Sequence, residues 1–350
     1  MKILILVFLL MTVCVFCNAQ TIYDSIQNAS AKKPESKVKT IFSVNTSKLI
    51  QLSGYTHIRY QFFEEKTKND GFDIRRARLN VKGAFTPSFS YRLQIDFVNS
   101  PNLLDAYAEY KLNKIVVFTL GQFTVPFSLE NTTPELSMES IDRSQAVEAL
   151  VGRTKDIIGN QGGRDIGIQV GGSLVELNNS PLIEYKLGLF NGAGVNTSDN
   201  NNDKDVVGRV LLHPIKGIDV GGSFYNGMGY YGQMPKNHIR NRYGCDIALR
   251  FANATFRAEY LHGKDSTINR AGFYLQAGYY IISKTLQLLA KYDTYNPNKD
   301  VSHNSTTNYI IGVNYNFTEN IRLQASYSIR KEESVEIKNN YAVVEFQIAF

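Results

Sequence analysis

From about residue 48 to the C-terminus, apolar and polar residues alternate with a period of two, and no other feature constrains the fold as strongly. Between Ile50 and Phe62, for example, one face is largely apolar, whereas the other face carries Gln51, His57 and Arg59. Successive side chains of a β-strand point to opposite faces of its sheet. The period therefore predicts strands that have one apolar and one polar face.

The alternating segments are separated by turn residues, and their number predicts sixteen strands. The connections alternate between short turns and longer polar loops, and the longer loops include 227–240, 263–269 and the longest, 126–163. Outer-membrane barrels have short periplasmic turns and long outer loops. The strands are expected near residues 49–63, 74–85, 89–98, 104–112, 115–125, 164–174, 182–190, 205–213, 217–226, 241–252, 254–262, 270–281, 284–294, 306–316, 320–331 and 339–350.

The polar face of these strands carries many charged residues in mid-strand positions. A water-filled lumen tolerates such residues and a packed core does not. A single soluble sheet of this size would also split into layers or domains, yet no linker follows residue 47. We therefore predict an all-β fold, a transmembrane antiparallel up-and-down β-barrel of 16 strands over residues 48–350, wide enough for an aqueous channel. The alternative is a soluble all-β adhesin or sugar-binding array.

The N-terminus predicts export. A charged Lys2 precedes an apolar run from Ile3 to Val15, and small or compact residues precede a cleavage site after Ala19. We interpret residues 1–19 as a signal peptide and residues 20–47 as a polar lead-in to the barrel. After cleavage Cys245 is the only remaining cysteine, so no intramolecular disulfide is expected.

Motifs for other functions are missing or incomplete. The sequence has no G-x-S-x-G, H-E-x-x-H or G-x-x-x-x-G-K motif, so we expect neither an enzyme nor a cofactor. The formal net charge of +6 is too diffuse to indicate nucleic-acid binding. A weak calcium candidate lacks the glycine and glutamate of a calcium loop, so we expect a solvated loop and no metal; its residues are Asp199, Asn201, Asp203 and Asp205.

The alternation also predicts which cations face the lumen. Folding the hairpin about Pro87 sets Lys82 beside Arg92 and Arg78 beside Asp96. Adjacent like charges are unfavourable unless an anion or water screens them, which favours an anion-preferring pore. Acidic residues on the same face favour the alternative, a solvated wall bridged by internal ion pairs. The predicted pore-lining cations are Arg76, Arg78, Lys82, Arg92, Lys186, Arg209, Arg242, Arg250, Arg257 and Arg322.

The long loop, residues 126–163, has apolar residues of its own. Leu136, Ile141, Val147 and Leu150 have a spacing that suits a short amphipathic helix. A loop of this length with such residues is expected to pack against the protein. We predict that it folds into the barrel and narrows the pore, and the alternative is a helix that caps the barrel from outside. The candidate constriction residues are Glu135, Glu139, Asp142, Arg143 and Glu148.

Several segments resemble the phosphate-selective porin O and P family. They are Gly121–Glu130 (GQFTVPFSLE), Arg164–Gln169 (RDIGIQ), the FNGAGVN stretch that begins at Phe190, and the pattern Asp199…Lys204-Asp205…Gly208-Arg209. The resemblance spans roughly residues 50 to 350. It implies a sixteen-stranded trimeric porin with an inward constriction loop and an arginine-lined pore.

Together these features predict a passive channel in the bacterial outer membrane. It would be surrounded by outer-membrane lipid, would form a homotrimer, and would admit small hydrophilic or anionic solutes, with phosphate among them. The alternative function is that of an outer-membrane binding protein or adhesin that acts through its extracellular loops.

Overall fold

The computed structural model describes residues 50–98, 100–177, 180–232 and 236–350. They belong to one compact unit, Lys48–Phe350. The predicted signal peptide, residues 1–19, and the predicted lead-in, residues 20–47, lie outside the described residues. Over the part of the chain that is described, no helix is long and apolar enough to cross a membrane.

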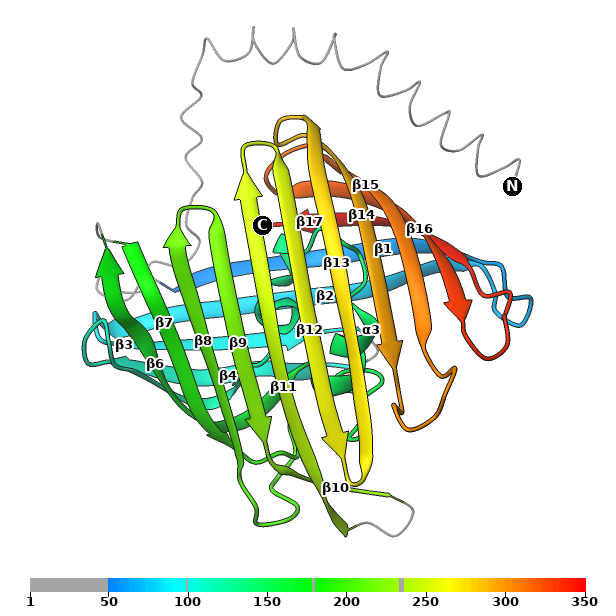
Figure 1. The fold of residues 1–350 in the computed structure, drawn as a ribbon. Coiled ribbons are helices and arrows are strands. Elements are labelled where there is room, and N and C mark those ends of the chain that lie inside the picture. The colour runs from blue at the N-terminus through cyan, green and yellow to red at the C-terminus, as the bar shows by residue number, and fades with distance from the viewer. Residues whose placement is uncertain (1–49, 99, 178–179, 233–235) are drawn as a thin grey trace, which may run out of the picture. The chain divides into compact units, whose positions relative to one another are not determined.

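The unit is a single antiparallel sheet of seventeen strand segments that follow one another in sequence order around a barrel (Figure 1). β9 and β10 are successive parts of one interrupted strand, because both pair with β11. The barrel therefore has sixteen strands. The segments are β1 (Gln51–Phe63), β2 (Gly71–Thr86), β3 (Phe89–Asp96), β4 (Asn102–Lys111), β5 (Val117–Thr124), β6 (Arg164–Leu177), β7 (Ser180–Phe190), β8 (Asp205–Ile215), β9 (Ile218–Asn226), β10 (Met228–Tyr231), β11 (Lys236–Phe251), β12 (Ala254–Asp265), β13 (Ile268–Ile282), β14 (Leu286–Asn296), β15 (Thr306–Asn316), β16 (Ile321–Glu332) and β17 (Tyr341–Ala349).

The first and last strands close the barrel. β1 pairs with β17 over nine residue pairs, from Tyr55 opposite Ala349 to Phe63 opposite Tyr341. Gly54 and Phe350 extend this ladder, since each donates its N–H to the carbonyl of the other at 3.0 Å. A closed sheet leaves no row of unpaired backbone groups. The sixteen-stranded closed barrel predicted from the alternation is thereby confirmed.

The two faces of the sheet have opposite character. Outward-facing apolar side chains such as Leu120 and Ile311 are more than 60% exposed, as expected of a surface that contacts lipid. Inward-facing polar side chains such as Gln276, Asp293 and Glu345 are at most 3% exposed. The polar residues therefore lie inside the sheet, and this arrangement is the reverse of a soluble sandwich.

Two predicted loops are largely strand. In the first, residues 227–240, β10 covers Met228–Tyr231 and β11 begins at Lys236. Residues 263–269 are polar and were expected to connect two strands, but β12 and β13 continue through them to a tight turn at Ser266 and Thr267. Asp265 pairs with Ile268, and Ser266 takes a positive φ of 56°. Polar residues are tolerated here because the strands extend beyond the apolar band of the barrel.

Candidate functional site

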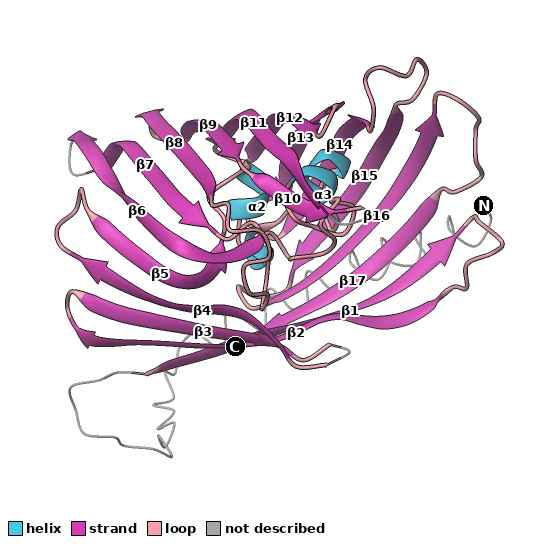
Figure 2. Ribbon diagram, turned by 90° about the horizontal axis from the view of Figure 1, so that it is seen from below, coloured by secondary structure: helices cyan, strands magenta, loops and turns pink. Residues whose placement is uncertain are grey.

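The segment between β5 and β6 lies inside the ring of strands (Figure 2). The N–H of Val125 donates to the carbonyl of Gly163 at 3.0 Å, so the two ends of the segment meet. Asn131 Nδ2 donates to the carbonyls of Val125 and Gly163, at 3.1 and 3.2 Å. Gly163 has a φ of +69°, and a Cβ there would lie 1.9 Å from Asn131 Oδ1, so a glycine is required. These contacts at the base of the loop direct it into the barrel.

A buried charge network fixes the first part of the loop, α2 (Leu129–Thr132), to the wall. The N–H groups of Leu129 and Glu130 donate to the Glu259 carboxylate of β12 at 2.7 and 3.3 Å. The Glu130 carboxylate accepts from Lys291 Nζ of β14 at 2.6 Å and from the Ser144 N–H at 2.7 Å. The side chains of Glu130 and Lys291 are at most 1% exposed. Removing either partner would leave an uncompensated charge.

The second helix of the loop, α3 (Gln145–Leu150), docks on the same wall. Its first N–H, that of Gln145, donates to the Asp293 carboxylate of β14. Val147 and Leu150 are fully buried. They pack in an apolar cluster with Phe127, Phe190 and Leu261.

The predicted amphipathic helix is therefore present but shorter than the spacing suggested. Of its four apolar residues, Val147 and Leu150 lie in α3, whereas Leu136 lies in a 3-10 turn, η1 (Glu135–Ser137), and is 41% exposed. Ile141 lies between the two helices and packs against Tyr341.

Three of the five constriction candidates hold the loop in place. The Glu139 carboxylate accepts hydrogen bonds from Gln276 and Gln287, at 2.8 and 2.9 Å. Asp142 pairs with an arginine of β2 at 2.9 Å and accepts a hydrogen bond from the Tyr341 hydroxyl. Glu148 accepts from the Thr154 N–H within the loop, at 3.2 Å. Glu139 is buried, and a buried carboxylate needs such donors, so this need accounts for its position.

The arginine that pairs with Asp142 is Arg75, which sequence reasoning missed. The register between β1 and β2 shifts after His57, so Arg75 is an extra residue in β2 and points inward together with Arg76. Arg75 also contacts Glu345 at 3.1 Å. Two consecutive arginines break the period of two, and such a break is the sequence signal of a β-bulge.

A cavity of about 380 Å³ lies between the loop and the wall formed by β1 to β6. Five arginines and two carboxylates line it. Among the predicted residues, Arg78 and Arg92 of the wall and Glu135 and Arg143 of the loop are in this set, whereas Glu139, Asp142 and Glu148 are not. Sequence reasoning missed Arg153, which lies within the loop, and Arg164, which begins β6 on the same strand face as the outward-facing Ile168. The charged lining residues are Arg78, Arg92, Arg143, Arg153, Arg164, Asp105 and Glu135.

The carboxylates of the cavity are each shared among arginines. Glu135 lies 2.8 Å from Arg143, 3.1 Å from Arg76 and 3.8 Å from Arg78. Burial by itself would raise the pKa of Glu135, but these guanidinium groups outweigh it and hold the pKa well below its usual range. Asp105 lies 2.7 Å from Arg164 and 3.4 Å from Arg92 of β3.

Arg153 has no carboxylate partner among the described residues. Its Nε and Nη2 donate to Asn131 Oδ1 at 3.1 and 2.8 Å, and the residue is 7% exposed. Burial and the nearby Arg143 lower the pKa of Arg153 well below its usual value, yet a guanidinium group stays protonated at neutral pH. With five arginines against two carboxylates, the lining of the cavity carries excess positive charge.

Arg76, another predicted cation, pairs with Glu135 of the loop. Two further predicted cations form ion pairs within the wall. Arg209 makes two bonds to Asp246, at 2.7 and 2.9 Å. Arg242 pairs with Asp265 at 2.6 Å. These ion pairs support the alternative of an internally bridged wall over much of the lumen.

The remaining predicted cations lie nearer the short turns or beside the loop. Arg250 pairs with Asp219, Arg257 contacts the Ser137 carbonyl at 3.4 Å, and Arg322 donates to Gln347. Lys186 lies opposite Arg209 in the ladder. Lys82 lies opposite Arg92 and Arg78 opposite Asp96, as the predicted hairpin required.

The calcium candidates do not converge. Asp199 pairs with Lys204. Asp203 accepts a hydrogen bond from Asn237 at 2.9 Å, and Asp205 accepts one from the Met228 N–H at 2.9 Å. Over the described residues, no group of three or more His, Cys, Asp or Glu side chains is placed to hold a metal ion.

Comparison with known proteins agrees with this geometry. The family model of phosphate-selective porin O and P matches residues 50–225 and 232–350. The chain belongs to this family. This porin is therefore an outer-membrane channel for passive diffusion of small hydrophilic solutes. No curated protein sequence matches it.

Solved structures share the porin fold at low sequence identity. OmpF of Salmonella typhi, solved in complex with daunomycin, is 12% identical, with a TM-score of 0.67 over 86% of this porin and 97% of that chain. The channel DcaP of Acinetobacter baumannii is 13% identical, with a TM-score of 0.64 over 88% and 99%. A loop L8 deletion mutant of OmpT from Vibrio cholerae is 11% identical, with a TM-score of 0.66 over 87% and 99%.

Changing Lys291→Met should release the loop, because it leaves Glu130 buried without a counter-charge. We expect the free energy of unfolding to fall by about 3–5 kcal/mol and the single-channel conductance in planar bilayers to rise. The double variant Glu130→Gln/Lys291→Met should recover part of the loss. Lys284→Met, in an exposed turn, is the control. An unchanged conductance and stability in Lys291→Met would contradict the anchoring role.

The lowered pKa of Glu135 predicts an acid-dependent contribution to stability. The contribution is fully present above the unfolded-state pKa, about 4.3, and is lost as the pH falls through the lower folded-state pKa. The difference in unfolding free energy between the native porin and Glu135→Gln should therefore stay constant from about pH 7 to about pH 5 and shrink only in stronger acid. Urea unfolding at stepped pH measures it. A difference that already shrinks between neutral pH and pH 5 would refute the assignment.

Proposed function

We propose that the arginine-lined cavity is the constriction of the pore and that it favours small anions over cations. The observation that carries the proposal is the charge of the lining, with five arginines against two carboxylates. The docked loop occupies the side of the barrel formed by β12 to β15, where Gln145 and Glu130 are bonded to β14. Solutes would therefore pass on the side of β1 to β6.

The electrostatics favour selectivity without tight binding. An anion 4 Å from a guanidinium gains about 4 kcal/mol at an effective dielectric constant of about 20, and it loses part of its hydration in return. Glu135 and Asp105 neutralise part of the lining, so the net field is moderate. Phosphate is included among the favoured anions, because a guanidinium group can donate two parallel hydrogen bonds to two phosphate oxygens. Arg209, Arg242 and Arg250 are proposed to stabilise the wall through their ion pairs.

Reversal potentials across planar bilayers in asymmetric potassium chloride test this preference. Arg153→Gln and Arg92→Gln should each reduce the chloride-to-potassium permeability ratio by about twofold to fivefold. Lys155→Gln removes the same charge from the same loop at a residue that does not line the cavity, and it should leave the ratio unchanged. A cation-selective native pore, or equal effects of all three changes, would refute the proposal.

We further propose that the exported protein begins at Gln20, after removal of residues 1–19, and that three copies assemble. The signal-peptide pattern supports the first part. The family resemblance supports the second, and OmpT of Vibrio cholerae, at 11% identity, has been solved in a trimer form. Native mass spectrometry of the protein from the outer membrane should give three mature chains. A monomeric mass, or a chain that retains Met1, would refute the corresponding part.

A further inference from the structure

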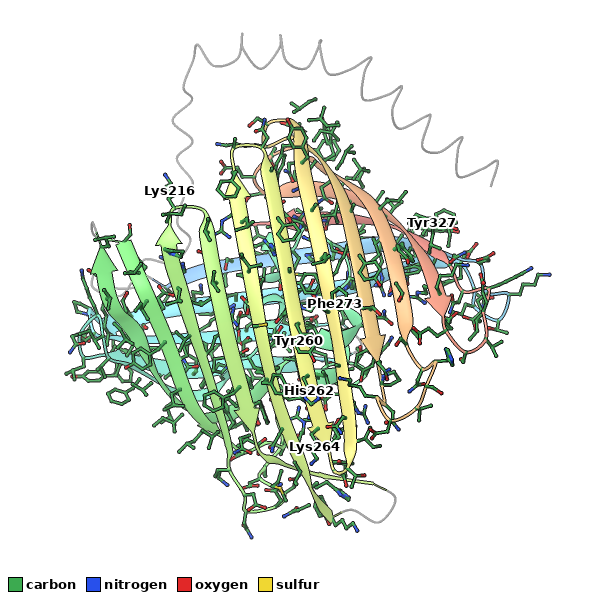
Figure 3. The ribbon with its side chains drawn as sticks, viewed as in Figure 1. Lys216, Tyr260, His262, Lys264, Phe273 and Tyr327 are labelled. Carbon is green, nitrogen blue, oxygen red and sulfur yellow. The ribbon has the colours of Figure 1, made fainter. Side chains whose placement is uncertain are left out.

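The outer surface of β11 to β15 carries a row of rings near the long-loop end of the barrel. Tyr260, His262, Lys264 and Phe273 lie on this surface (Figure 3). Their strand neighbours Leu261 and Asp265 are at most 2% exposed and face the lumen. The alternation therefore places a histidine and a lysine on the face that contacts lipid.

The rings form a belt of two groups of contacting rings, which meet where Tyr260 lies opposite Phe273 in the ladder. Tyr243 stacks on His262 with ring centroids 4.6 Å apart and planes inclined by 19°. Phe273 and Tyr292 lie 5.6 Å apart, and Tyr292 and Tyr309 lie 5.4 Å apart. Belts of this kind mark the level of the lipid head groups. The long loops at this end place the belt in the outer leaflet.

Two lysines lie just beyond this belt, on either side of Asn269. Lys264 is opposite Asn269 in the ladder, and the N–H of Lys299 donates to the Asn269 carbonyl at 2.8 Å. Both lysines are exposed. Within the described residues, neither side chain forms an ion pair or a hydrogen bond. His262 lies two residues before Lys264 in β12 and therefore on the same face of the sheet.

Nearby carboxylates do not neutralise this pair. Asp265 faces the lumen, where it pairs with Arg242 and Arg270 at 2.6 and 3.1 Å. Asp300 follows Lys299 and is exposed, without an ion pair in the described part of the chain. Other loop lysines are neutralised locally by Glu65, Asp199 and Glu336. The surface beside Asn269 therefore has cations in excess at the level of the head groups.

We propose that Lys264, Lys299 and His262 bind a phosphate group of an outer-leaflet lipid. Lysine ammonium groups at a membrane surface attract anionic head groups. The acyl chains of the same lipid would lie on the apolar surface toward the middle of the bilayer, where Leu275 and Ile311 are 43% and 61% exposed. A free phosphate ion would gain nothing from this apolar surface, which is why we assign the site to a lipid. The site is separate from the pore, because the strands lie between them.

Native mass spectrometry of the full-length mature porin in detergent tests the proposal, with bisphosphorylated lipid A as the probe and its phosphate-free analogue as the reference. The native porin should retain the bisphosphorylated lipid in preference. Lys264→Gln/Lys299→Gln should weaken this retention about 30-fold, as expected for two lysines at a charged lipid surface. The matched control is Lys216→Gln/Lys284→Gln, which removes two exposed lysines at the short-turn end and should change nothing.

Single-channel conductance of each variant shows that the barrel is folded and open, and it should remain at the native value. Equal retention of the two lipids, an equal loss in the control variant, or full displacement of the lipid by millimolar inorganic phosphate would each overturn the proposal. Because the ion selectivity of the pore does not enter this measurement, its outcome is independent of the proposed anion preference.

Discussion

The closure of the sheet between β1 and β17 is the constraint on which the rest of the structure depends. A bilayer offers no hydrogen-bond partners, so every backbone group of a spanning strand must pair within the protein. The nine-residue ladder between the two ends of the chain satisfies this need, and the bonds between Gly54 and Phe350 complete it. Once the sheet is closed, polar side chains within the apolar band face inward, and the lumen becomes the place where their charges must be balanced.

That balance determines where the open space lies. The loop between β5 and β6 brings its own carboxylates into the lumen, where they meet cations from distant strands. Lys291 neutralises Glu130, and Arg75 neutralises Asp142. Because these partners lie on β14 and β2, the loop is held on both sides, and the cavity remains next to β1 to β6. The arginines left without full neutralisation then set the proposed selectivity.

On the outer surface of the barrel, the surrounding lipid determines which side chains are allowed. Lipid requires apolar side chains at the middle of the barrel and allows rings and cations only near the head groups. The belt from Tyr243 to Tyr309 and the two lysines beside Asn269 occupy that level. Inner and outer charges are thus separated by a single layer of strands and serve different partners.

The sequence by itself determined the barrel, because a period of two is a local property of the chain that survives in any register. It also determined which face most strand residues take, and it placed Lys82 opposite Arg92. It did not show that a β-bulge turns Arg75 inward. It did not show that β12 and β13 extend to the turn at Ser266, since strand ends beyond the membrane carry no alternation of hydrophobicity.

The roles of individual loop residues were decided only by tertiary structure. Glu135 and Glu139 look alike in sequence, yet one lines the cavity and the other accepts hydrogen bonds from Gln276 and Gln287, because the wall residues that meet them come from strands more than a hundred residues apart in the chain.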